Sequence, residues 1–187
     1  MGLLSAVGGA LVGGLAAVRG ARIGAEVNAA AVLAQGRLQA AGALEQWVRQ
    51  ERQKACLQVM DCYGQFSREC VQYREQLKES RPLDEPTLDS FTAALAALVG
   101  ACSHLALLGP TSVQAAGGVV RAKAEGFRST LMLWNEELAE ALLVVPQPDL
   151  TEITGVWLDI LVENGGAMNA AYLEFLHTGQ TELLRPV

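Results

Sequence analysis

Two runs of apolar residues repeat with a spacing of three and four residues, and this repeat limits the chain to helices that pack along narrow stripes. The steps alternate 3, 4, 3, 4, 3, 4 in the first run and 3, 4, 3, 4, 3 in the second. Such positions lie on one side of a helix and face a partner helix. The first run is Cys56, Val59, Tyr63, Phe66, Cys70, Tyr73 and Leu77, and the second is Leu88, Phe91, Leu95, Leu98, Cys102 and Leu105.

Proline and capping residues indicate where the first two helices end. Residues 26–80 contain no proline, and Pro82 ends this helix because the residue before a proline is pushed out of the α region. Asp84 is expected to cap the second helix, with Pro86 in its first turn and Gly109 at its end. Upstream of Cys56 the first helix carries a looser apolar stripe through Leu38, Ala41, Leu44 and Val48.

The second half of the chain predicts two further helices. Thr111 and Gln114 fit a capping box at the start of the third helix, and a two-proline break covers residues 145–148. Asp149 and Glu152 fit a second capping box. The expected apolar face of the third helix is Val113, Ala116, Val120, Ala124, Phe127, Leu131, Trp134, Leu138 and Leu142.

We expect the last helix to bury Ile153, Trp157 and Ile160, and to be interrupted at Gly165-Gly166. A short final segment should then reach Gly179 through Met168, Tyr172 and Phe175.

The short linkers favour antiparallel neighbours, so the fold class is all-α, an up-and-down bundle of about four main helices. We divide the chain into an apolar segment (1–25), a helical bundle (26–179) and a tail (180–187). A continuous first helix over residues 26–80 would be about 80 Å long, roughly twice its partners. Either it breaks near Gly36, Gly42 or Gly64, or its front half projects from the bundle.

The first eighteen residues carry no charged side chain, and Arg19 and Arg22 follow them. As a helix this segment would be about 27 Å long, close to the roughly 30 Å of a bilayer core. Small residues at four-residue steps are typical of helices that approach closely in membranes. They form two series, Gly9, Gly13 and Ala17, and Ala16, Gly20 and Gly24.

Several interpretations of this segment stay open. It can be a helix inserted in or lying on a membrane, a small-residue helix in a soluble core, a flexible glycine-rich stretch, or a cleaved signal peptide, although no basic region precedes it. In a membrane, Arg19 and Arg22 would hold the rest of the chain on the cytoplasmic side, where Arg37 would also meet anionic lipid. The expected location is the cytoplasm or the inner face of the cytoplasmic membrane.

Charge argues against nucleic acid as a partner. The net charge is −6, and ten basic and seven acidic residues in 1–81 give +3, while four and thirteen in 82–187 give −9. A binder of phosphate backbones needs clustered basic side chains. The small basic cluster Arg49, Arg52 and Lys54 contains Glu51 and is interpreted as a solvated face.

No set of residues predicts catalysis, a metal site or a cofactor. Cys56, Cys70 and Cys102 lie on apolar stripes, Cys62 completes no Cys-x-x-Cys pair, and His104 and His177 are far apart. A disulfide from Cys70 or Cys56 to Cys102 is the alternative to free core thiols, and would need an oxidising compartment. The pairs Glu136/Glu140 and Asp159/Glu163 lack the Glu-x-x-His partner of di-metal bundles, and Trp47, Trp134 and Trp157 are expected in the core or at interfaces.

The stretch from Trp47 to about Glu140, with VRQERQKACLQVMDCYGQF and LALLGPTSVQAA, resembles a diffuse group of uncharacterised helical proteins from actinobacteria. In that group an arginine-rich helix with aromatic residues is followed by a Leu-Gly-Pro turn and another helix, often beside an apolar membrane segment. The resemblance implies a bacterial helical domain that faces the cytoplasm, and it implies no activity.

The sequence therefore predicts a non-enzymatic interaction or scaffold protein. We expect it to form a homo-oligomer or to bind a helical protein partner, with its N-terminal segment as a membrane tether. The alternative is a membrane-permeabilising effector whose glycine-rich segment inserts and oligomerises. A metal enzyme that uses bundle carboxylates is a third hypothesis.

Overall fold

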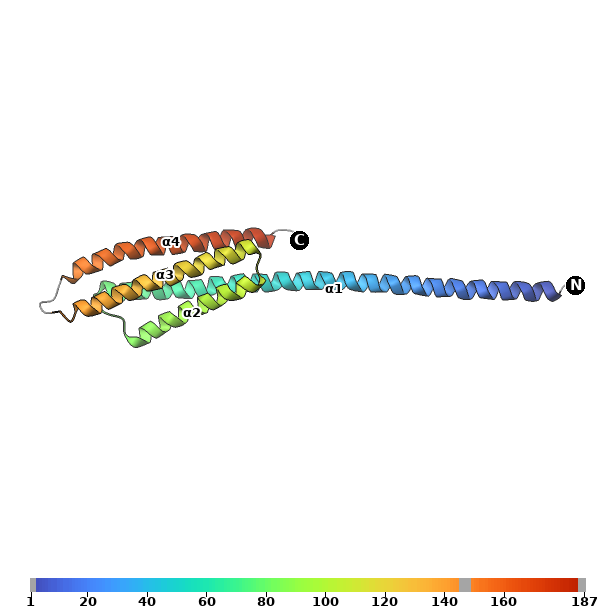
Figure 1. Ribbon diagram of the computed structural model, residues 1–187, viewed down its shortest axis with the longest axis horizontal. Helices are drawn as coiled ribbons and strands as arrows, with labels where there is room; N and C mark the ends of the chain where they lie inside the picture. Colours follow the sequence, from blue (N-terminus) through green and yellow to red (C-terminus); the bar gives the residue numbers. More distant parts are fainter. Residues whose placement is uncertain (1–2, 145–148, 185–187) are drawn as a thin grey trace. The chain divides into compact units, whose positions relative to one another are not determined.

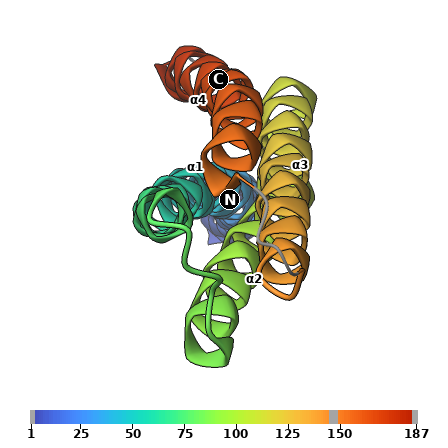
Figure 2. The same cartoon turned by 90° about the vertical axis from the view of Figure 1, so that its left-hand side faces the viewer.

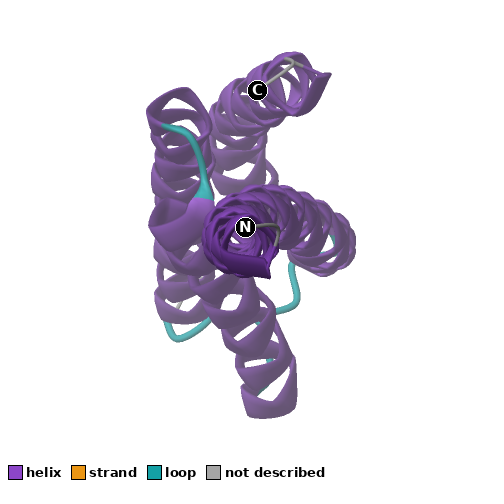
Figure 3. Ribbon diagram, turned by 90° about the vertical axis from the view of Figure 1, so that its right-hand side faces the viewer, coloured by secondary structure: helices purple, strands orange, loops and turns teal. Residues whose placement is uncertain are grey.

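The computed structural model describes the backbone of residues 3–144 and 149–184, and the side chains of residues 19–144 and 149–182. It contains four helices, α1 (Leu3–Lys78), α2 (Glu85–Leu108), α3 (Thr111–Ala141) and α4 (Leu150–Leu184). The described residues include no strand, and short loops join the helices (Figure 3). The all-α fold expected from the heptad spacing is confirmed.

The chain divides into two compact units, Met1–Trp47 and Val48–Val187. In the second unit, residues 48–78 of α1 run antiparallel to α2, α3 runs antiparallel to both α2 and α4, and the four helices surround one core (Figures 1 and 2). This arrangement is the expected up-and-down bundle. The unit starts at Val48, whereas we placed the start of the bundle at residue 26.

The apolar runs of α1 and α2 form one side of the core. All seven residues of the α1 run are buried. Of the six residues of the α2 run, five are buried and Leu88 is partly exposed. Phe91 stacks on Phe66 with ring centroids 5.3 Å apart and meets Tyr73 edge-on at 4.9 Å. These aromatic contacts fix the register of α1 against α2. From α3 the core receives Val113, Val120, Ala124, Phe127, Leu131, Trp134 and Leu138.

Helix α1 does not break at any of the glycines proposed as hinges, because Gly36, Gly42 and Gly64 all lie within its continuous span. A glycine inside a helix costs about 1 kcal/mol relative to alanine, which lowers stability without forcing a kink. The helix ends where the sequence predicts. Ser80 adopts a left-handed backbone with φ of 55°, and its N–H donates to the Leu77 carbonyl at 2.9 Å.

The helix starts follow the predicted caps in part. Asp84 Oδ1 accepts a 3.0 Å hydrogen bond from the Thr87 N–H, as expected of the α2 cap. The capping box at Thr111 is wrong, because α3 begins there after Pro110 and no side chain caps it. Gln114 instead donates from Nε2 to the Gly109 carbonyl at 2.7 Å, so it closes the preceding turn.

Helix α4 corrects two predictions. Gly165-Gly166 does not interrupt it, and it continues past Gly179 to Leu184, into the segment predicted as a tail. A Cβ on Gly165 would lie 3.4 Å from Phe127 Cε2, so this glycine lets α4 approach α3 closely. Apart from Gly179, the buried residues of α4 recur at seven-residue steps, and they are Thr154, Leu161, Met168 and Phe175.

The predicted face of α4 was therefore misplaced at its start. Ile160 is 38% exposed and Ile153 is only partly buried, whereas Leu161 is buried. Trp157 lies at the edge of the core, where its Nε1–H donates to Glu137 Oε2 at 2.6 Å. At this edge the indole N–H has a carboxylate within reach, whereas Nε1 of the fully buried Trp134 has no hydrogen-bond partner among the described residues.

Candidate interaction surface

Residues 19–47 of α1 are exposed without exception, although they include large apolar side chains. Each of these side chains is more than half exposed. Helices in water owe most of their stability to the packing of an apolar face, and the described side chains of residues 19–47 have no such packing. The large apolar side chains are Ile23, Val27, Val32, Leu33, Leu38, Leu44 and Trp47.

Four of these side chains form, together with three exposed alanines, a narrow line along one side of the helix. Its members follow one another at steps of three or four residues, the same spacing that is buried between residues 56 and 77. A line this narrow fits one partner helix rather than a broad core. We call it the exposed stripe, and it consists of Ile23, Val27, Ala30, Ala34, Leu38, Ala41 and Leu44.

The residues proposed for helix packing in a membrane lie either within the first turns of residues 19–47 or before them. Gly20 and Gly24 are open, because a Cβ at either position would meet no atom within 4 Å. Arg19 and Arg22 are exposed, and Arg22 Nε pairs with Glu26 Oε1 at 3.1 Å. The remaining small residues, Gly9, Gly13, Ala16 and Ala17, lie outside the residues whose side chains are described.

The cysteines are core residues rather than a reactive site. All four thiols are free, so neither proposed disulfide to Cys102 is present. Burial raises the pKa of Cys56 and Cys70, and it raises the pKa of Cys102 to about 11 against the opposing effect of Arg121. The thiolate is the nucleophile, so buried thiols of raised pKa are poor nucleophiles at neutral pH.

The other candidate ligands do not converge. In the described part of the chain no three His, Cys, Asp or Glu side chains lie close enough to hold a metal ion. His104 and His177 are exposed, as are the two carboxylate pairs Glu136/Glu140 and Asp159/Glu163.

The interpretation of Arg52 as a solvated residue is wrong. Its Nε donates to the Leu108 carbonyl at 2.8 Å, fifty-six positions away in the sequence. The last carbonyls of a helix lack intrahelical partners and carry partial negative charge, so this guanidinium satisfies the end of α2. Sequence spacing gave no signal for a contact between α1 and the far end of α2.

Helix α2 has the composition of a membrane span. Among the described residues it is the one helix that is long and apolar enough to cross a bilayer, and its outer face includes Leu107, which is 82% exposed. No charged residue occurs from residue 90 to residue 108. Core helices of soluble proteins share these features, and seven residues of α2 are buried in the bundle.

Comparisons with known proteins give no assignment for this surface. No protein-family model, curated protein or solved structure matches the chain.

Proposed function

We propose that this protein is a non-enzymatic helical scaffold that pairs with a second copy of itself through residues 19–47, and that its N-terminal segment tethers the pair to a membrane. The observation that carries the proposal is the complete exposure of residues 19–47, large apolar side chains included. The occupant we assign to the exposed stripe is the same stripe of a second copy. The tethered pair would face the cytoplasm.

The size of the stripe suits a reversible association. Burial of one Val, Leu or Ile side chain contributes about 1.5–3 kcal/mol. Four such residues on each copy, Ile23, Val27, Leu38 and Leu44, give a gross gain on the order of 10 kcal/mol or more. Association costs roughly 4–15 kcal/mol in lost freedom, so the two terms are comparable. We therefore expect a dimer that depends on protein concentration.

Charge favours an antiparallel pair. Suppose that the two helices run antiparallel and that the Val32 positions of both copies lie at the same level along the axis. Arg19 of one copy then lies level with Glu45 of the other, because each is thirteen residues from Val32. Glu26 and Arg37 lie six and five residues from the same centre, so they also meet. A parallel pair in register would place each of these charges beside its own like charge, which is unfavourable.

The same antiparallel alignment matches the apolar positions. Ile23 lies level with Ala41, and Ala30 lies level with Ala34, since each pair is equally distant from Val32. A large residue thus lies level with a small one at Ile23 and at Leu44, whose level partner is Gly20, while two alanines lie level at the middle of the stripe.

Two valines provide a matched test of self-association. Val27 belongs to the exposed stripe, while Val32 lies about 140° around the helix, and both are exposed. Sedimentation equilibrium of the full chain should show a dimer that Val27→Asp converts to monomer and that Val32→Asp leaves intact. A monomeric full chain, or equal loss of dimer in both variants, would contradict self-association.

The membrane tether requires a separate test. Liposomes of phosphatidylcholine and phosphatidylglycerol should carry the full chain upward in a density gradient. Leu11→Arg should abolish flotation, because an arginine at the centre of a membrane helix costs about 2.5–3.5 kcal/mol. Leu33→Arg, outside the uncharged segment, should float like the unmodified chain. Failure of the full chain to float removes the tether and leaves the dimer untouched.

A second candidate function is membrane permeabilisation, in which the glycine-rich N-terminal segment inserts and oligomerises through the small residues spaced four apart. Release of a dye trapped in the same liposomes distinguishes the two functions. A tether should leave the vesicles sealed, whereas an inserting effector should empty them.

A further inference from the structure

Two cavities lie between α1 and α4 in the bundle. One has a volume of about 380 Å³ and the other about 510 Å³. Both fall within the range of small-molecule sites, roughly 300–1,000 Å³. They are separated along the two helices by Tyr63 of α1 and Tyr172 of α4, whose rings stack across the gap.

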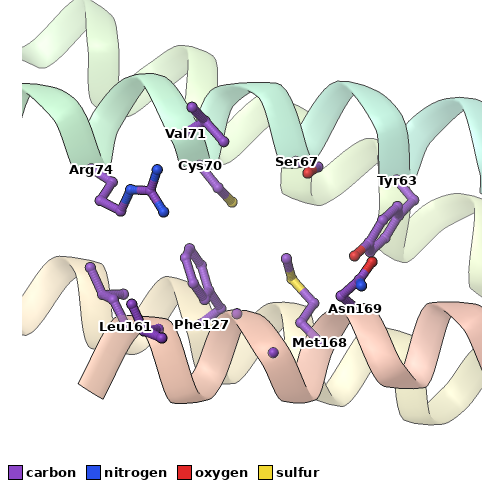
Figure 4. A pocket seen from close by; sticks show the side chains of 12 residues that line it. Tyr63, Ser67, Cys70, Val71, Arg74, Phe127, Leu161, Met168 and Asn169 are labelled. Carbon is purple, nitrogen blue, oxygen red and sulfur yellow. The ribbon is translucent and has the colours of Figure 1, made fainter. Parts of the chain in front are cut away.

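Small residues create the first cavity. Figure 4 shows Cys70 and Ser67 on α1 opposite α4, where Gly165 and Gly166 contribute no side chain. Gly166 is exposed, and a Cβ on it would meet no atom within 4 Å, so a larger side chain can be accommodated at this position. Phe127 of α3 forms part of the wall.

The first cavity is lined by one arginine, whose charge is shared with the neighbouring Glu75. Of the twelve described residues that line it, Arg74 is the one with a charged side chain, and it extends from α1 into the opening (Figure 4). Its Nε and Nη2 donate to Glu75 Oε1 at 3.2 and 3.0 Å, and its Nη1 has no acceptor among the described residues. A guanidinium with spare donors beside an apolar space suits a carboxylate.

The second cavity is apolar. Met60, Phe175 and Leu176 contribute to its wall, and none of its seven described lining residues is charged. From Arg74 to Met60 the α1 helix rises about 21 Å. The cavities therefore offer a charged end and an apolar end on one line.

We propose that the groove between α1 and α4 binds a single-chain fatty carboxylate, with its carboxylate on Arg74 and its alkyl chain directed toward Met60. The chain passes between the cavities by displacing Tyr172, which is partly exposed, whereas Tyr63 is buried. The binding is independent of the self-association proposed above, because no residue of the exposed stripe lines either cavity.

Calorimetry with palmitate tests this site in the full chain. We expect saturable binding of one palmitate per chain, weakened about tenfold by Arg74→Gln, since a hydrogen bond to a charged group is lost. Gly166→Leu should abolish binding by filling the cavity. The matched controls are Arg68→Gln, on the same helix but outside the cavity, and Gly155→Leu, at an open glycine of α4 outside the cavity.

The head group has its own control, because hexadecanol lacks the carboxylate. It should bind the unmodified chain and Arg74→Gln with equal affinity, and circular dichroism should show that Gly166→Leu keeps the helical fold. The site is refuted if palmitate fails to bind, or if Arg74→Gln and Gly166→Leu bind it as tightly as their controls do.

Discussion

Tyr63 and Tyr172 stack face to face across the gap between α1 and α4, with ring centroids 3.8 Å apart and ring planes 8° apart. Cavities lie on both sides of this pair, so the two rings form the contact between α1 and α4 at a point where the surface on either side is hollow. The stack therefore holds α4 to α1 at the middle of the groove.

Replacing each tyrosine with leucine should reveal the energy of this contact. Stacked aromatic pairs contribute about 0.5–1.5 kcal/mol beyond the area they bury. In a double-mutant cycle of Tyr63→Leu and Tyr172→Leu, urea unfolding at one protein concentration should give a coupling of about 1 kcal/mol. A coupling near zero would mean that the rings only fill space.

The tyrosines should make the bundle sensitive to alkaline pH. Burial, followed by the nearby Tyr172 and Cys70, raises the pKa of Tyr63 to about 12, and burial together with Glu69 raises the pKa of Tyr73 to about 12. A folded-state pKa above the unfolded value of about 10 means that the folded chain holds these protons more tightly. Their contribution to stability is complete below pH 10 and is lost between about pH 10 and 12.

The free energy of unfolding should therefore fall across that pH window, and Tyr63→Phe should reduce the slope. Ultraviolet difference spectra should show the tyrosines of the folded chain ionising at higher pH than in urea. Coincident titration curves for the folded and unfolded chains would contradict the assigned environment.

Two adjacent residues of α4 test the observed face. Leu161 is 2% exposed and Ile160 is 38% exposed. Leu161→Ala should destabilise the bundle by about 2–5 kcal/mol, the usual range for a buried leucine. Ile160→Ala should cost distinctly less, and thermal or urea unfolding measures both. A larger loss of stability from Ile160→Ala than from Leu161→Ala would contradict the observed buried face and support the face predicted from the sequence.

The sequence did not show which side of α4 is buried, because adjacent residues of this helix are similarly apolar. Ile160 and Leu161 are neighbours of similar hydropathy, so spacing alone does not decide which of them points inward. In the structure Leu161 lies on the same face as Gly165, whose backbone packs beside Phe127 of α3, and this face is the one that α4 turns inward. In α1 and α2 the runs contain no such competing neighbour at most positions, and there the spacing predicted the buried residues.

The spacing of apolar residues also could not show that the exposed stripe lies on the surface. The stripe through Leu38, Ala41 and Leu44 has the same periodicity as the run that contains Tyr63 and Phe66. One is exposed and the other is buried in the core of the bundle formed by residues 48–187. Periodicity predicts that a partner is needed, and it does not say whether the partner belongs to the same chain.

Antiparallel self-association through residues 19–47 is tested most directly by the distance between the Gln46 positions of two copies. A nitroxide label at Gln46→Cys, in a Cys62→Ser background that leaves only buried thiols, can be measured by double electron–electron resonance. Gln46 lies fourteen residues beyond Val32, so in an antiparallel pair the two labels are twenty-eight residues apart along the axis.

This offset corresponds to an axial separation of about 42 Å between the two labels. We expect a distance distribution centred near that value, which disappears when Val27→Asp is added and persists when Val32→Asp is added. Labels closer than about 20 Å would indicate a parallel pair. The absence of any dipolar signal in the unmodified background would contradict self-association through residues 19–47.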